Sequence, residues 1–268
     1  MSHSEIVSTG LNRIQRLAHL RRLPRLGRIR LGERRLLRRN NRSVQVPVEL
    51  GWFKFDAESL RSYPAIRELY GDRPKELDIL LPVEDPRLFF PQACKLYGKG
   101  GALKCKGDGR RAERWLCDKC GQMACDCTGA PKSLAEIECP CELLERRDCR
   151  FIGSLMVILP RVSCAGVWQV DTSSAYSIVS INSDVDYIRS LCGRVAHVPL
   201  TLRRLPRPEG TQCGRRVGHS LKITFDLGME QLQQIQRGVM PSQEAESRGG
   251  AETRRGWVTD ETATAHDF

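Results

Sequence analysis

Residues 154–159 read Ser-Leu-Met-Val-Ile-Leu, a continuous apolar run typical of a central β-strand. Residues 166–170, Gly-Val-Trp-Gln-Val, form a second run, and the polar turn Asp171–Ser174 follows it. Apolar side chains then recur every three or four residues; they are Ile178, Ile181, Val185, Ile188 and Leu191. The stretch therefore predicts two strands and a helix that ends at Gly193. We expect Trp168 and the apolar helical face in the core, and the polar turn as the helix cap.

Further strands are expected at residues 46–55, 76–83, 102–105, 195–205 and 220–227. Pro199 lies inside one of them and places it at an edge or a bulge. Trp52, Phe53 and Phe55 are expected in the core. Strands mixed with a few helices predict an α+β fold with a mixed, largely antiparallel sheet.

Three further helices are predicted. Asp56 is expected to cap one that Pro64 breaks and that Gly71 ends after Tyr70. Asp85-Pro86 is expected to open another, running through Cys94 to Tyr97. A short polar helix is expected at residues 231–237.

The net charge of +11 is concentrated near the N-terminus. Residues 13–42 hold twelve arginines, no lysine and one acidic residue, Glu33, so the rest of the chain sums to zero. We expect a flexible basic arm over residues 1–24, a body over residues 25–237 and a disordered tail over residues 238–268. The alternation of Leu, Ile and Arg in residues 23–32 predicts that part of the basic region is an ordered strand.

The basic region favours a phosphate-rich partner such as DNA. The expected contact residues are Arg13, Arg16, Arg21, Arg22, Arg25, Arg28 and Arg30. An acidic protein surface fits equally well, because the guanidinium fork binds phosphate and carboxylate alike. A general bias towards arginine is the remaining alternative.

Eight of the twelve cysteines lie between Cys105 and Cys149, separated by short gaps in Cys117-x-x-Cys120, Cys125-x-Cys127 and Cys139-x-Cys141. Such gaps suit a tetrahedral metal better than disulfides, whose Cα separation is fixed. The region is also poor in aliphatic residues, so metal binding would supply its folding energy. We expect a structural Zn²⁺ in an insertion at about residues 105–150, bound by four of Cys117, Cys120, Cys139, Cys141 and Cys149. Cys105, Cys125 and Cys127 are further candidates, and a set of free thiols is the alternative.

The N-terminal residues contain no apolar run that would form a signal peptide. No segment of about 18 apolar residues is present, so we expect no membrane span. A reducing cytoplasm is the expected location, which favours metal-binding cysteines over disulfides.

No convincing catalytic set is visible. His197 and His219 lie in or beside expected strands, and the glycines of residues 98–109 do not form a phosphate-binding loop. The adjacent carboxylates of Glu84 and Asp85 would point apart at a strand end. A site built only from cysteine is typically structural, whereas catalytic zinc keeps an open position. We therefore expect no enzymatic activity.

Two long stretches, residues 77–109 and 139–206, resemble the recombination directionality factor-like proteins of phages that use large serine integrases, and their prophage relatives. Five pieces carry the resemblance by their order and spacing. They are Lys106–Gly109, Cys139-Pro-Cys141 with Cys149, Gly166–Ser174, Ser180–Ser183 and Val198–Leu202. The likeness covers most of residues 25–228.

The resemblance implies a non-catalytic binding protein. Such factors bind a large serine integrase, including the integrase–DNA complex, and switch it from integration to excision. Two other functions remain open: a zinc-containing nucleic-acid-binding protein that uses the N-terminal arginines, and a metallohydrolase.

Overall fold

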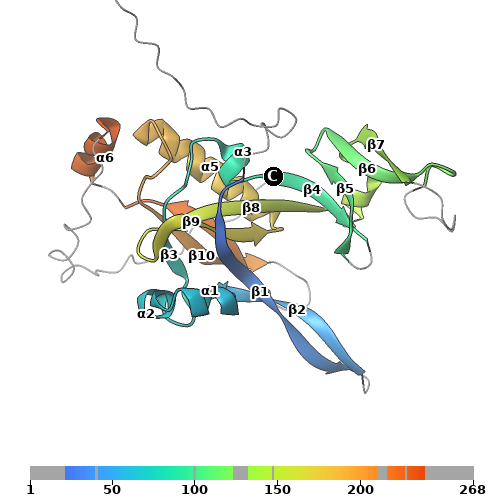
Figure 1. The fold of residues 1–268 in the computed structure, drawn as a ribbon, viewed down its shortest axis with the longest axis horizontal. Coiled ribbons are helices and arrows are strands. Elements are labelled where there is room, and N and C mark those ends of the chain that lie inside the picture. Colours follow the sequence, from blue (N-terminus) through green and yellow to red (C-terminus); the bar gives the residue numbers. More distant parts are fainter. Residues whose placement is uncertain are drawn as a thin grey trace, which may run out of the picture.

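The computed structural model describes residues 22–39, 42–98, 101–122, 132–146, 148–209, 216–226 and 228–238. The expected tail, most of the expected arm, Cys125 and Cys127 lie outside these ranges. The fold is α+β, as predicted: two mostly antiparallel sheets carry a few helices (Figure 1).

The larger sheet has eight strands in the order β2-β1-β9-β8-β4-β5-β6-β7. Its centre is the hairpin of β8 (Arg150–Leu159) and β9 (Ser163–Thr172), whose apolar runs are buried almost throughout. Such two-sided burial is the physical reason for a continuous apolar run. β1 (Arg25–Arg39) pairs with β9 in parallel, and β4 (Gln92–Tyr97) pairs with β8 in antiparallel.

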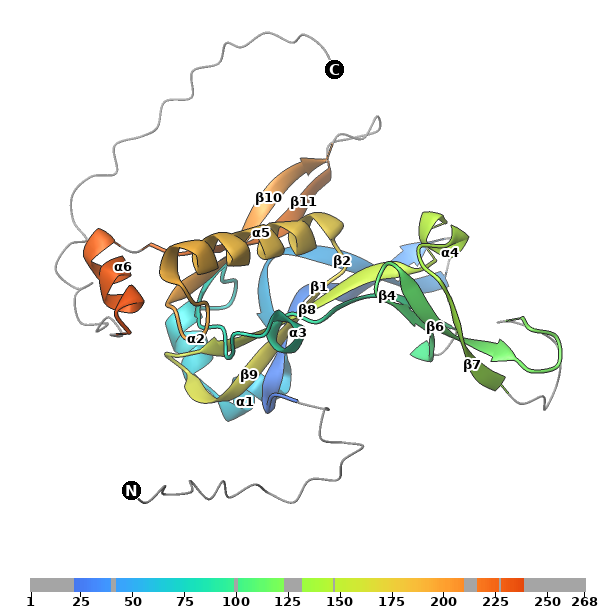
Figure 2. The same ribbon diagram turned by 90° about the horizontal axis from the view of Figure 1, so that it is seen from above.

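A long ribbon extends one side of this hairpin. β1 pairs with β2 (Arg42–Phe55) over nearly its full length, and the ribbon projects from the body (Figure 1). The other side continues as a meander of β5 (Leu103–Gly107), β6 (Arg111–Cys117) and β7 (Lys132–Glu138), followed by the short helix α4 (Glu142–Glu145). Figure 2 shows this meander reaching away from the body at the end of the sheet.

The smaller sheet consists of β11 (Arg216–Thr224), β10 (Leu200–Glu209) and β3 (Glu76–Ile79), in that order. Side chains of both sheets form the main core, together with those of helix α5 (Ala175–Cys192), and Trp168 and Phe53 are fully buried in it. Ile181, Val185 and Ile188 lie on the buried face of α5, as the periodicity predicts. Ser174 accepts a hydrogen bond from the N–H of Ser177, so the polar turn does cap the helix.

Helix α5 also covers the outer edge of β11. The hydroxyl of Ser177 accepts the N–H of Leu221, and the carboxylate of Asp184 accepts the N–H of Ile223. These bonds pair backbone groups that an edge strand would otherwise leave open.

An ion pair between a buried arginine and a half-exposed glutamate connects the base of the ribbon to the smaller sheet. The side chain of Arg204, on β10, is 3% exposed and bonds to Glu49 at 2.6 Å. Its other donors reach the carbonyl oxygens of Leu50 and His219. The guanidinium thus has the several partners that a buried charge requires.

Most of the predicted short elements are confirmed. Asp56 caps α1 (Ala57–Ser62), which ends before Pro64; α2 (Ala65–Tyr70) follows and ends at Gly71. Helix α6 (Met229–Gln236) lies where the short polar helix is predicted.

Two elements differ most from their predicted boundaries. The helix that begins after Asp85 is only α3 (Pro86–Phe89), and the residues from Gln92 to Tyr97 form strand β4 instead. Cross-strand pairing with β5 and β8 outweighs the local helix signal there. Strand β10 starts after Pro199 rather than containing it, and its own prolines, Pro206 and Pro208, lie near its far end.

Replacement of Ile181 by Ala should lower the free energy of unfolding by roughly 2–5 kcal/mol, because the side chain is 0% exposed in the main core. Val179 in the same helix is 63% exposed, so Val179→Ala serves as the control and should change stability by less than about 0.5 kcal/mol. Urea unfolding followed by circular dichroism measures both. Equal midpoints for the two variants would contradict the assigned helical face.

Candidate functional site: a cysteine cluster and a basic ribbon

Five thiols gather on the inner face of the meander, beneath α4. Cys94, Cys105, Cys139 and Cys149 belong to a small buried cluster, and Cys141 lies at the start of α4. The same cluster contains Leu96 and Ala112, with Ile137, Leu143 and Leu144 packed at its side. This second core is small, and cysteine supplies much of it.

Strand register explains why these thiols meet. Cys94 pairs with Gly107, and Leu96 pairs with Cys105, so alternate residues of β4 and β5 face the same side. Gly107 leaves room for a neighbouring sulfur: a Cβ at this position would lie 3.0 Å from Cys139 Sγ and 2.8 Å from Ala112 Cβ. The glycine of the Lys106–Gly109 motif therefore has a packing role.

Arg114 brings a positive charge to the cluster. Its NH2 group donates to Cys141 Sγ at 3.1 Å, and its guanidinium also bonds to Cys105. Burial opposes ionisation of Cys141, but the backbone N–H of Leu143 and the Arg114 guanidinium outweigh it and lower the pKa of this thiol.

Two other thiols are held neutral. Burial, the nearby charge of Cys139 and a hydrogen bond to Cys139 raise the pKa of Cys94 to about 12. Burial raises the pKa of Cys149, and the neighbouring Cys105, Cys139 and Cys141 raise it further. The cluster therefore contains thiols with opposite tendencies to ionise.

The five predicted zinc ligands fall into two separate groups. Cys139, Cys141 and Cys149 lie in the cluster, whereas Cys117 and Cys120 lie at the opposite end of the β6–β7 hairpin. Arg111 pairs with Glu138, beside Cys139, and Cys117 pairs with Lys132 six residues further along. Six residues of strand span roughly 20 Å. A single ion therefore cannot combine both groups in this conformation.

Cys94 and Cys105 belong to the cluster, whereas Cys117 and Cys120 do not. Cys105 is one of the further candidates from the sequence, but Cys94 is predicted to lie in a helix, and only its pairing in β4 reveals its position. Among the residues that the structure describes, no group of three or more His, Cys, Asp or Glu side chains is arranged to hold a metal ion.

The arginines that are predicted to contact DNA or an acidic protein surface lie in different environments. Arg13, Arg16 and Arg21 lie outside the described residues. Arg25 donates to the side chain of Gln169 at 2.7 Å. Arg22, Arg28 and Arg30 are exposed, and Arg30 stands opposite Lys54 in the ribbon. The ordered basic surface thus begins in β1, as the alternation in residues 23–32 suggests, and extends further along the strand to Arg34, Arg35 and Arg38.

A groove of about 1580 Å³ lies between the base of the ribbon, α4 and the turn before α5. Some of its polar groups are engaged in hydrogen bonds within the protein. Asp171 Oδ1 accepts from Ser154 Oγ and Gln169 Nε2, both at 2.6 Å. His219 also lines the groove; burial and the nearby Arg204 lower its pKa.

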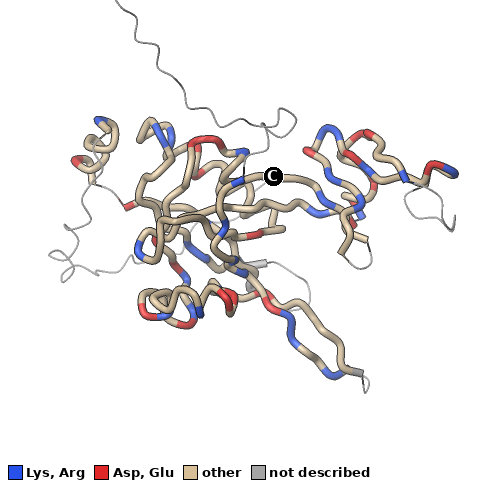
Figure 3. The backbone as a smooth tube through the Cα atoms, viewed as in Figure 1, with Lys and Arg blue, Asp and Glu red and all other residues tan. Residues whose placement is uncertain are grey.

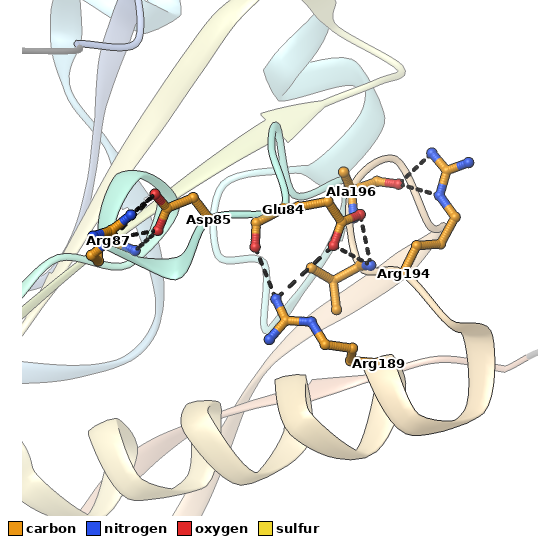
Figure 4. Close-up of polar contacts among 7 residues, drawn as sticks. Glu84, Asp85, Arg87, Arg189, Arg194 and Ala196 are labelled. Atoms are coloured by element: carbon orange, nitrogen blue, oxygen red, sulfur yellow. Dashed lines mark hydrogen bonds and ion pairs between the residues drawn. The ribbon is translucent and has the colours of Figure 1, made fainter. Parts of the chain in front are cut away.

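The adjacent carboxylates of Glu84 and Asp85 have structural roles (Figure 4). The Glu84 carboxylate accepts the N–H groups of Val195 and Ala196, the latter at 2.7 Å, while its carbonyl accepts from Arg189. Asp85 caps α3 by accepting the N–H of Arg87. The two carboxylates point apart, and both hold backbone N–H groups in place. This agrees with the expectation that they do not form an acid–base pair.

A family model described as recombination directionality factor-like (Gp3-like) matches residues 26–227. This span contains the ribbon, both sheets and the cysteine cluster. The chain therefore belongs to the recombination directionality factor-like family, whose role is in recombination, and the resemblance seen in the sequence is confirmed. No curated protein and no solved structure gives a significant match. None of the described helices is long and apolar enough to cross a membrane.

Thiol labelling should separate the cluster from the surface. At pH 8, after chelator treatment, we expect iodoacetamide to modify the exposed Cys120 and Cys164 quickly and Cys94 slowly, because burial and its thiol neighbours raise the pKa of Cys94 to about 12. Peptide mass spectrometry at timed intervals measures the rates. All three sites should react at comparable rates in denaturant. Equally fast labelling of Cys94 in the folded protein would show that the cluster is open.

Proposed function

We propose that this protein binds a large serine integrase and shifts it from integration towards excision, while the integrase performs the chemistry. The family match over residues 26–227 carries the proposal, because it spans the whole described body apart from its two ends. The engagement of Asp171, Glu84 and Asp85 in structural hydrogen bonds supports a binding role. The proposed location is the bacterial cytoplasm, where the integrase acts.

Such a protein acts through differential affinity. A partner shifts a two-state integrase only if it binds one synaptic state better than the other. A change of the equilibrium from 1:99 to 99:1 requires a preference of about 5.5 kcal/mol. A docking surface supplies free energies of this size without a reactive group, which agrees with the absence of a visible catalytic set from the sequence.

An excision assay with the integrase encoded nearest to this gene tests the proposal. We expect the purified protein to promote recombination between the recombinant attachment sites and to inhibit the integration reaction. Co-purification on immobilised integrase should accompany the switch. An active integrase that neither binds the protein nor changes direction in its presence would overturn the proposal.

We also propose that the body contains a structural Zn²⁺ at the cysteine cluster, with Cys105, Cys139, Cys141 and Cys149 as ligands. The donor chemistry suits zinc, since a tetrathiolate site carries negative charge and Arg114 lies beside it. The described thiols would have to turn towards a common point at about 2.3 Å from the ion. A core this poor in aliphatic side chains also benefits from a metal.

Elemental analysis of the purified protein tests this second proposal. We expect one zinc per chain, and we expect Cys149→Ser to lose it and to melt at a lower temperature, because structural zinc contributes roughly 10–16 kcal/mol in small modules. The exposed Cys164, outside the cluster, provides the control variant Cys164→Ser, which should keep both metal and stability. A folded wild-type protein without metal would contradict the proposal. Two ions per chain, with one retained in Cys149→Ser, would indicate a second site at Cys117 and Cys120.

A further inference from the structure

The β1–β2 ribbon has two chemically different faces. Residues 33–39 pair with residues 42–48 in unbroken register, so alternate residues and their partners share a face. One face carries Arg34, Leu36 and Arg38, opposite Pro47, Gln45 and Ser43. The other carries Glu33, Arg35 and Leu37, opposite Val48, Val46 and Val44.

A carboxylate is present on the second face only. Glu33 binds Arg35 at 2.6 Å and Lys54 at 2.7 Å, so its carboxylate satisfies two cations. These hydrogen bonds, from Lys54 first and then Arg35, lower the pKa of Glu33. The described side chains of this face are therefore largely aliphatic, with one carboxylate shared between two cations.

The first face keeps its positive charge. Arg34 and Arg38 are exposed and have no carboxylate partner among the described residues, whereas many exposed arginines of the body do. Body examples are Arg67 with Asp72, Arg111 with Glu136 and Arg161 with Asp78. Figure 3 shows the positive residues along the ribbon, away from the mixed charges of the body.

The shape of the ribbon suits a groove of duplex DNA. Residues 33–39 extend it by roughly 20 Å as two strands alone, with no other strand paired beside them. The major groove is about 12 Å wide and admits a two-stranded ribbon. Arg34 and Arg38 are four residues apart, or about 13 Å along the strand, so they can contact two separate phosphates.

We propose that this basic face, centred on Arg34 and Arg38, binds the phosphate backbone of duplex DNA without sequence preference. The neighbouring Leu36, Gln45 and Ser43 on this face are uncharged, so no negative charge opposes the approach of the ribbon to the duplex. This inference does not depend on integrase binding, because the surface is complete in the protein alone. Its partner is a phosphodiester backbone, recognised by charge and spacing.

The test measures binding of the full-length protein to a 30-base-pair duplex of arbitrary sequence by fluorescence anisotropy, from 50 to 200 mM KCl. Arg34→Gln/Arg38→Gln should make the log–log salt slope shallower by about 1.8, since each phosphate contact contributes about 0.9. At 0.1 M salt the loss should be roughly tenfold or more.

Arg61→Gln/Arg237→Gln is the matched control, because it removes the same charge from two exposed arginines at the ends of α1 and α6. It should keep the wild-type slope. Circular dichroism and thermal melting should show that both double variants fold.

Three results would overturn the proposal. One is no DNA binding by the wild type at 50 mM salt. Another is an unchanged slope in the ribbon variant, with affinity lost instead on deletion of residues 2–21; this deletion spares Pro24, whose carbonyl accepts the N–H of Val167. The third is unchanged DNA binding with loss of integrase binding, which would assign the ribbon to a protein surface and leave the proposed function intact.

Discussion

The structure depends on the burial of the β8–β9 hairpin. Both faces of these strands are covered, and Leu155, Val157, Trp168 and Val170 are almost completely excluded from water. Full burial of side chains of this size stabilises a fold by about 1.5–3 kcal/mol each. The hairpin has two edges, and each edge is used: β1 joins β9 in parallel, and β4 joins β8 in antiparallel. The basic ribbon and the cysteine cluster are therefore two extensions of one central unit.

The sequence predicts the elements whose signals are local. The apolar runs, the spacing of Ile181, Val185 and Ile188, and the caps at Asp56 and Ser174 each depend on residues within one turn or one strand. These elements appear where they were expected, although β8, β9 and β11 have different limits. β4 was missed because its strand character comes from partners in β5 and β8, while Asp85-Pro86 gives a genuine helix start that ends after one turn.

For the candidate sites too, the sequence predicts the features that depend on local signals and misses those that depend on distant partners. Spacing indicates which cysteines can share a turn, but Cys94 and Cys149 are 55 residues apart and meet only when β4 pairs with β8. The alternation in residues 23–32 predicts an ordered strand, but it ends before residue 33, so the sequence does not indicate that the strand continues to Arg39. The division of the β1 arginines between the two faces follows from strand alternation, but the residues opposite them depend on the register with β2, which no local pattern specifies.

The eight-stranded sheet ends in two open edges, β2 and β7, and each carries features that oppose self-association. Pro47 interrupts the outer edge of β2 because it has no N–H to offer to another strand. Lys132, Glu136 and Glu138 place charges along β7, so a second copy would meet unfavourable contacts there. Both edges of the sheet are thus weakened as templates for pairing with another chain.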